Sequence, residues 1–411
     1  MTDKQDQGET QPETEMMTRG WDPTRGMGSI KTPLFQTATF TFESAQAAKR
    51  AFDITYGGEE PEADEEVGYI YTRLDHPNLV VVESRLAVWD RVDRALLFSS
   101  GMSAIYTALL TLLSPGDLIL HSSPLYGGTN SLFEKVLGPM GIEAVSFGPD
   151  AEEADLDELV AGRNLGVVYV ESPANPTNDI FDIAMAARVA KRNRAPVMVD
   201  NTYLGPIGQQ PHAHGADLAV YSATKYYGGH SDLVAGVVTG ADRLLRAIKT
   251  MRYRIGTQAD PHSAWLLGRS LETYALRAQR QVDNASRVAR FLAGHPKVNR
   301  VGYLGLIGED DPRRALFDRQ CSSPGAMITF EVDGGRGEAF RFLDAMKLVG
   351  LATSLGGTES IASHPVTTSH SNVDAETRHR MGVNEAMIRF SVGIEAADDI
   401  IADLEQALAA I

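Results

Sequence analysis

The stretch from Leu218 to Asp232, LAVYSATKYYGGHSD, places a lysine where an apolar run gives way to small polar residues. A lysine at the end of a buried strand has a lowered pKa, because burial disfavours its charged form. Its neutral amine can attack an aldehyde and form a Schiff base. Ser222 and Thr224 stand just before Lys225 and offer hydroxyls to the phosphate of an aldehyde cofactor. Considered alone, however, this pattern more often marks a surface lysine at the end of a strand.

A second apolar run precedes this stretch and ends in the carboxylate of Asp200, followed by Asn201 and Thr202. A lysine that binds an aldehyde, together with an acid for a pyridine nitrogen, is the minimum protein requirement for pyridoxal 5′-phosphate (PLP). The pairing of Lys225 with Asp200 therefore predicts a PLP site, which the rest of the chain can test.

The sequence from Ser99 to Met102 has the form of an anion site at a strand-to-helix junction. Free backbone N–H groups and the positive end of a helix dipole attract phosphate at such a junction. Gly101 would also permit the turn without any ligand, so the motif is weak alone. Combined with Ser222 and Thr224, it predicts a phosphate cup.

Two further polar segments are candidates for contact with the cofactor ring and the substrate. Tyr126 precedes two glycines that free its flat ring to stack on a cofactor, although a core tyrosine beside a flexible turn fits equally well. Asn175 lies in a loop braced by Pro173 and Pro176 and can hydrogen-bond a ligand oxygen. A plain turn is the alternative for this loop.

Two arginines stand where an anion is expected. Arg389 lies on a short apolar run, where a guanidinium needs either a substrate carboxylate or an internal ion pair. The glycines of the segment from Ser354 to Gly357 allow close approach of backbone to a ligand. Tyr71 and Arg73 lie on one side of an extended segment outside the sheet domain. They either reach a neighbouring subunit or are simply exposed.

The composition excludes several classes of function. The chain has 411 residues, 43% hydrophobic, with a net charge of −16, which argues against nucleic acid or an anionic membrane as partner. No apolar run approaches the ~20 residues of a membrane span. The single cysteine, Cys321, fits a reducing, cytoplasmic compartment. His212 and His214 have no further ligand cluster beside them, so we expect no metal site.

The order of apolar runs predicts an α/β protein with a smaller second domain. Runs without polar alternation suit parallel strands covered on both faces; they lie at 95–98, 118–121, 166–171, 196–200, 218–222 and 236–239. A long or broken helix is expected at 263–294, with strands at 326–332 and 389–393 and helices at 337–346 and 397–410. We therefore expect an N-terminal arm and dimer-contact segment (1–75, disordered over its first 15 residues), a PLP-binding α/β domain (76–262) and an α+β domain (263–411).

Taken in order, these motifs resemble the Cys/Met-metabolism family of PLP enzymes, which includes cystathionine γ-synthase, cystathionine lyases, methionine γ-lyase and homoserine-ester sulfhydrylases. The resemblance runs from about Thr32 to the C-terminus. Its motifs are Y-x-R at 71–73, S-G-M at 100–102, Y-G-G at 126–128, E-S-P-x-N-P at 171–176, D-N-T at 200–202, S-A-T-K at 222–225, S-L-G-G at 354–357 and R-x-S-V-G at 389–393.

The resemblance implies an aspartate-aminotransferase-type fold (fold type I) with a mostly parallel sheet, and a homotetramer of two catalytic dimers. It implies that Lys225 and Tyr126 are catalytic. The implied cofactor-binding residues, of which the first two would act from the neighbouring subunit, are Tyr71, Arg73, Gly101, Met102, Asp200, Thr202, Ser222 and Thr224. The implied residues for the amino-acid substrate are Asn175, Thr353, Ser354 and Arg389.

Three departures from the family pattern leave the substrate open. Thr353 stands where cystathionine enzymes often carry glutamate, Gly127 stands where methionine γ-lyases carry cysteine, and the acidic loop at 57–67 is long. The chemistry implied is γ-elimination on a γ-substituted L-amino acid of the methionine, cystathionine or homoserine-derivative type. γ-Replacement by a thiol is the alternative. A non-catalytic PLP-binding protein is a third hypothesis, disfavoured by the intact Lys225, Tyr126 and Arg389.

Overall fold

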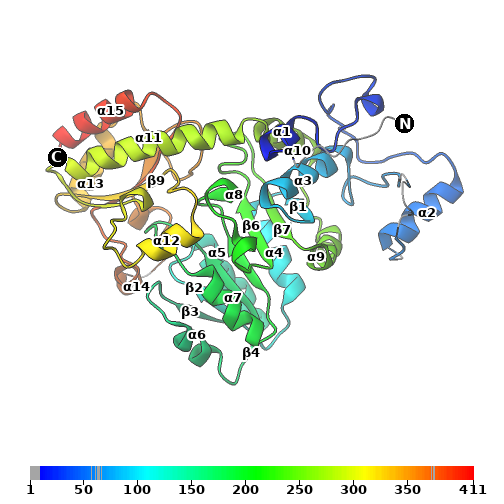
Figure 1. Cartoon of the computed structure of the whole chain (residues 1–411), viewed down its shortest axis with the longest axis horizontal. Helices are drawn as coiled ribbons and strands as arrows, with labels where there is room; N and C mark the ends of the chain where they lie inside the picture. Colours follow the sequence, from blue (N-terminus) through cyan, green and yellow to red (C-terminus); the bar gives the residue numbers. More distant parts are fainter. Residues whose placement is uncertain are drawn as a thin grey trace.

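The computed structural model describes residues 10–56, 58–60, 62, 65, 67–371, 373 and 375–411. The chain folds around two sheets, with an N-terminal arm that extends away from both (Figure 1). The arm carries α1 (Pro12–Thr18), a 3₁₀ turn (Pro23–Gly26) and α2 (Ala45–Tyr56). In the view of Figure 1, α2 lies at the outer end of the arm, far from the second sheet.

The first sheet has seven strands in the order β1-β7-β6-β5-β4-β2-β3. Their bounds are β1 (Arg94–Phe98), β2 (Asp117–Ser122), β3 (Glu143–Phe147), β4 (Asn164–Glu171), β5 (Val197–Asp200), β6 (Leu218–Ser222) and β7 (Gly236–Gly240). The pairs from β6 through β5, β4 and β2 to β3 are parallel, and β7 pairs antiparallel with both β6 and β1. The predicted mostly parallel α/β sheet is confirmed.

Helices cover both faces of this sheet, as expected for strands without polar alternation. Val167 and Tyr169 of β4 point into one apolar cluster with α4 (Gly101–Leu112) and α9 (Asp242–Ile255). Val168 and Val170 point the other way, against α6 (Glu153–Val160) and α7 (Ile183–Arg192). The remaining helices of this region are α3 (Pro77–Asp90), α5 (Gly127–Leu132) and α8 (Gly205–Gly208).

The second sheet has five strands in the order β10-β11-β12-β9-β8. Their bounds are β8 (Val298–Gly302), β9 (Met327–Val332), β10 (Gly350–Leu351), β11 (Ile361–Ser363) and β12 (Met387–Ser391). The helices of this part are α10 (Pro261–Leu271), α11 (Tyr274–Gly294), α12 (Arg314–Gln320), α13 (Arg336–Ala345), α14 (Ala375–Arg380) and α15 (Ala397–Ala409). The predicted smaller α+β part is confirmed, while the exact domain boundaries stay predictions.

Three sequence expectations about elements were wrong or incomplete. The run at 236–239 was expected to be parallel, but the segment between β6 and β7 contains no crossover helix, so the chain returns antiparallel. The edge strand β3 was not anticipated, because most of it is exposed and its sequence lacks an apolar run. The first 15 residues were expected to be disordered; residues 1–9 lie outside the described residues, but α1 begins at Pro12, with Met16 fully buried.

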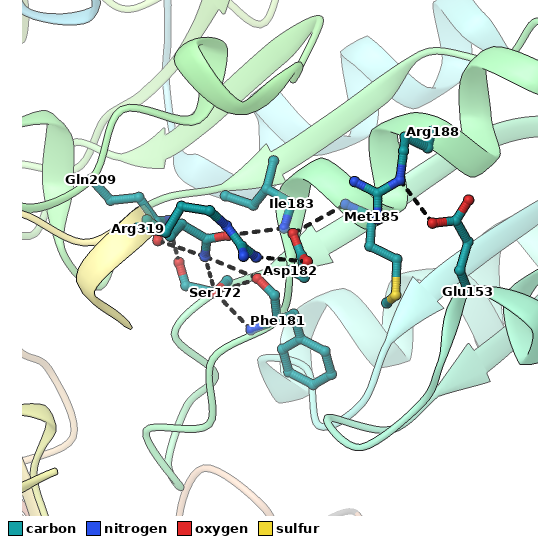
Figure 2. A network of polar contacts seen from close by, with 10 residues as sticks. Glu153, Ser172, Phe181, Asp182, Ile183, Met185, Arg188, Gln209 and Arg319 are labelled. Atoms are coloured by element: carbon teal, nitrogen blue, oxygen red, sulfur yellow. Dashed lines mark hydrogen bonds and ion pairs between the residues drawn. The ribbon is translucent and has the colours of Figure 1, made fainter. Parts of the chain in front are cut away.

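A buried polar junction joins α12 to the loop that follows β4 (Figure 2). The amide nitrogen of Gln320 donates to the carbonyl of Phe181 at 2.9 Å, and its amide oxygen accepts from the backbone N–H of Ile183 at 2.9 Å. Gln209 donates to the Ser172 carbonyl at 2.7 Å. The same loop contains Asn175, so this junction sets the position of a predicted site residue.

Among the described residues, every helix is too short or too polar to span a membrane.

Candidate active site

A cavity of about 260 Å³ lies at the carboxyl ends of the central strands, between the two sheets. It is lined by Ser100, Gly101, Met102, Ile105, Tyr126, Glu171, Asn175, Asp200, Thr202, Tyr203, Ser222, Thr224, Lys225, Val234, Thr353, Leu355 and Arg389. Ligands of open α/β sheets bind at this edge. Most of the residues predicted from the sequence therefore meet in one place.

One end of the cavity has the form of an anion cup. Ser100 caps α4, accepting from the Ser103 backbone N–H at 3.0 Å, so the N–H groups of the first turn face the cavity end. A Cβ on Gly101 would stand 2.9 Å from the Cβ of Ser222, so only glycine allows this close approach. Thr202 accepts the backbone N–H of Ser222 at 2.9 Å and thereby fixes the end of β6.

Asp200 lines the cavity with a buried carboxylate. This carboxylate accepts from the Thr202 backbone N–H at 3.1 Å and from the Tyr169 hydroxyl at 3.2 Å. Burial raises the pKa of Asp200, and no described cation offsets the effect of burial. A protonated ring nitrogen would supply the missing positive charge.

Glu171 was given no role by the sequence analysis, yet it organises the site. One oxygen of its buried carboxylate accepts from the Tyr126 backbone N–H at 2.7 Å and the other from the Asn175 backbone N–H at 2.9 Å. Burial and the neighbouring Asp200 raise the pKa of Glu171. A single carboxylate thus fixes both the predicted stacking ring and the predicted substrate amide. The signals for Glu171 in the sequence were its place at the end of an apolar run and its membership of the E-S-P-x-N-P motif.

Lys225 lies in the loop after β6, with its Nζ pointing to Ser354. The ammonium nitrogen donates to the Ser354 Oγ at 2.8 Å. Burial, followed by the positive charge of Arg389, lowers the pKa of Lys225 to about 8. The predicted nucleophile is therefore closer to its neutral form than an ordinary lysine.

Arg389 is a buried cation without an ion pair among the described residues. Strand β12 holds it, 3% exposed. One guanidinium nitrogen donates to the Thr353 and Ser354 carbonyls at 2.7 and 3.0 Å, and another to the Asn175 side-chain oxygen at 3.2 Å. These neutral acceptors leave its charge uncompensated, which favours an anionic ligand over the alternative of an internal ion pair.

The ring of Tyr126 is partly exposed at the cavity, as its proposed stacking role requires. It stands at the N-terminus of α5 with 43% of its surface exposed. A Cβ on Gly127, the next residue, would lie 2.6 Å from the Ser369 carbonyl oxygen. The glycine at this position is therefore required by the packing of the neighbouring segment.

Tyr71 and Arg73 do not line the cavity of their own chain. Arg73 donates to the Tyr253 carbonyl at 2.5 Å, and its guanidinium lies 6.0 Å from the Tyr71 ring centre. Both belong to the segment that precedes α3, and the hydrogen bond to Tyr253 holds Arg73 against α9. Their prediction as cofactor-binding residues thus depends on a second subunit.

The cavity residues fit PLP by their chemistry. A helix N-terminus with hydroxyls suits the phosphate, a buried carboxylate without a cation suits the pyridinium, and a lysine with a lowered pKa suits the aldehyde. An uncompensated guanidinium suits an amino-acid carboxylate. No group of three potential metal ligands occurs among the described residues.

Comparison with known proteins identifies the family of the chain. The family model for the Cys/Met metabolism PLP-dependent enzymes matches residues 13–409, and the chain belongs to this family. It is 39% identical to an L-methionine gamma-lyase from Pseudomonas putida over 97% of both chains. It is 36% identical to an O-succinylhomoserine sulfhydrylase from Pseudomonas aeruginosa, over 92% of this chain and 90% of that protein.

Solved structures place the fold in the same group. A cystathionine gamma synthase from Xanthomonas oryzae pv. oryzae, in complex with aminoacrylate and cysteine, superposes with a TM-score of 0.88 at 31% identity, covering 98% of each chain. The protein is thus a fold type I, PLP-dependent enzyme that acts at the γ-carbon, as the sequence predicted.

Proposed function

We propose that the protein catalyses γ-elimination on a methionine-type L-amino acid, releasing a thiol, ammonia and a 2-oxo acid. In this proposal Lys225 and Tyr126 are the catalytic residues. Ser222, Thr224, Thr202, Gly101 and Met102 bind the phosphate and Asp200 the ring nitrogen, as the cavity geometry suggests. Bound PLP supplies an electron sink for the carbanions that form at the substrate.

The protons of the reaction fall to groups on opposite sides of the cavity. Elimination needs protons taken from Cα and Cβ of the substrate and one delivered to the departing sulfur. Lys225, with a pKa of about 8, can remove and return protons near neutral pH. Tyr126 can donate a proton to the leaving group from its partly exposed position.

Arg389 and Asn175 would hold the substrate α-carboxylate beside Ser354. Their mutual contact at 3.2 Å gives a fixed pair of donors, and the two carbonyls behind Arg389 keep its guanidinium in place.

One observation carries the choice of substrate: the cavity has no spare carboxylate for a distal ammonium. The only carboxylates among its described lining residues are Glu171 and Asp200, and backbone N–H groups occupy both. Thr353 contributes a neutral side chain. Charge-assisted hydrogen bonds contribute roughly 1.5–3 kcal/mol, so their absence costs cystathionine about one to two decades of selectivity.

The test compares kcat/KM for L-methionine, L-homocysteine, O-acetyl-L-homoserine and L-cystathionine by 2-oxo acid release. We expect cystathionine to be no better than the substrates without a second charge. Thr353→Glu, which restores the family carboxylate, should improve cystathionine selectively, with Thr353→Gln as its uncharged control. A clear preference of the native enzyme for cystathionine would sink the substrate proposal.

γ-Replacement is the second candidate, favoured by the similarity to the sulfhydrylase. Both reactions share the steps up to loss of the γ-substituent, and they differ in whether a thiol then adds to the unsaturated amino-acid skeleton that remains. Product analysis with and without added sulfide or thiol separates them. Efficient capture with only traces of 2-oxobutanoate would assign the protein to the replacement enzymes.

We further propose a homotetramer built from two dimers, in which Tyr71 and Arg73 complete the phosphate site of a neighbouring subunit. Their place on the arm, outside their own cavity, supports this arrangement. A cytoplasmic location is consistent with the single cysteine, Cys321, which is buried and free.

A further inference from the structure

Tyr203 lines the active-site cavity and carries a buried hydroxyl without a hydrogen-bond partner among the described residues. It follows Asp200 by three positions and lines the cavity with 5% of its surface exposed. Its hydroxyl has no hydrogen-bond partner in the described part of the chain. Buried hydroxyls are almost always paired, so an unpaired one at a ligand cavity points to a ligand atom as its partner.

The surroundings of Tyr203 indicate the chemical type of the ligand atom that its hydroxyl would bind. Burial raises the pKa of Tyr203, so the phenol is a neutral donor over the whole physiological range. The uncompensated charge of Arg389 acts on the same phenol. A hydroxyl donor beside an unpaired guanidinium selects an anionic oxygen.

Tyr226 provides an internal comparison. Its hydroxyl is also buried and without a partner among the described residues. The positive charge of Arg389 acts on the pKa of Tyr226 as it does on that of Tyr203. Unlike Tyr203, however, Tyr226 does not line the cavity. The two tyrosines therefore share a buried, unpartnered hydroxyl, and only Tyr203 belongs to the described cavity lining.

We propose that the Tyr203 hydroxyl donates a hydrogen bond to an anionic oxygen bound in the cavity, and so acts as a further ligand-binding residue. That oxygen belongs either to the substrate α-carboxylate, shared with Arg389, or to the ring of the cofactor. The inference rests on the proposed function, because both ligands are assigned there.

The experiment uses Tyr203→Phe, with Tyr226→Phe as the matched control. Neither change removes a hydrogen bond within the described chain, so both variants should retain the thermal midpoint of the native apoprotein. Three dissociation constants are measured: PLP with the apoprotein, and L-norleucine and n-pentylamine with the holoenzyme, by visible absorbance. L-Norleucine has the shape of methionine without a leaving group, and n-pentylamine lacks its carboxylate.

A loss of roughly 10- to 100-fold in L-norleucine affinity, with n-pentylamine unchanged, would identify the carboxylate as the partner. A similar loss in PLP affinity would identify the cofactor oxygen. Unchanged constants in Tyr203→Phe, or the same losses in Tyr226→Phe, would overturn the inference alone. Failure of the native apoprotein to bind PLP would overturn the proposed function and the inference with it.

Discussion

The acidity of Lys225 decides how readily the apoprotein can capture an aldehyde. Only the neutral amine reacts, and its fraction rises with pH until the pKa is passed. Since burial and Arg389 lower that pKa to about 8, the rate of PLP capture should rise with pH and level off above about 8. An ordinary lysine would continue to gain until about 10.4.

Stopped-flow absorbance across pH 6–10.5 checks this expectation. Arg389→Met removes the second cause of the shift and should move the midpoint upward, while burial keeps it below that of a free lysine. Lys225→Ala should lose the yellow absorbance of lysine-bound PLP and nearly all turnover. A native rate still climbing above pH 10 would contradict the assigned environment of Lys225.

A substitution at Gly127 tests how tightly the chain packs next to the ring of Tyr126. Gly127→Ala places a Cβ 2.6 Å from the Ser369 carbonyl, so the backbone must move. We expect a loss of roughly 1–3 kcal/mol in the free energy of unfolding, together with lower turnover because Tyr126 is displaced. Gly294→Ala is the control, because no heavy atom lies within 4 Å of its added Cβ. Chemical unfolding midpoints of the two variants make the comparison.

The residues of the site were largely predictable from the sequence, since each predicted cavity residue follows or lies on an apolar strand. Glu171 and Tyr203 were missed as functional groups for a physical reason. Glu171 acts by joining the backbone N–H of Tyr126, 45 positions away, to that of Asn175 in its own loop, and Tyr203 is defined by an absent partner. Neither property leaves a pattern in residue spacing.

At the scale of elements, α12 and the loop after β4 depend on each other through Gln320. Gln320→Met keeps the volume of the side chain but leaves the Ile183 N–H without this partner, while the Phe181 carbonyl keeps only the longer hydrogen bond from the Ser172 hydroxyl at 3.3 Å. Because an unpaired buried group costs about 1–3 kcal/mol, we expect the unfolding free energy to fall by that amount. KM for the amino acid should also rise, because Asn175 lies in the same loop.

Arg319, on the same helix, provides the control for this prediction. It forms an exposed ion pair with Asp182 at 2.8 Å (Figure 2), which is worth about 0–1 kcal/mol. Arg319→Ala should therefore change unfolding and KM little. Equal effects of the two substitutions would show that the buried amide has no special role.

The elements predicted best were those whose apolar pattern reflects burial on one or both faces. The helix at 183–192 matches α7, and the expected broken helix is α10 followed by α11. Strand direction was predicted less well, because a run such as 236–239 carries the same residues whether parallel or antiparallel. Its antiparallel direction follows from the connection that precedes it, which an apolar run does not encode.

At the scale of the whole molecule, the proposed dimer would add a cation to each phosphate cup. The described residues of the cup, which are Ser100, Gly101, Met102, Ser222 and Thr224, carry no positive charge. Arg73, in the segment before α3, donates to the backbone carbonyl of Tyr253. A C2 dimer would let Arg73 of each subunit complete the other site. The motif order suggests this exchange, and the place of Arg73 outside its own cavity agrees with it.

Subunit mixing tests the exchange directly. Lys225→Ala and Arg73→Ala should each be nearly inactive as pure proteins. In a mixed dimer, the site with an intact Lys225 receives an intact Arg73 from its partner, while the other site carries both lesions. Random reassociation of equal amounts places half of the dimers in the mixed form, so activity should recover to about one quarter of the native value. Arg73→Lys, which keeps the charge but loses the bidentate fork, should weaken PLP binding less than Arg73→Ala. Full activity in a monomeric fraction, or no recovery on mixing, would refute the shared site.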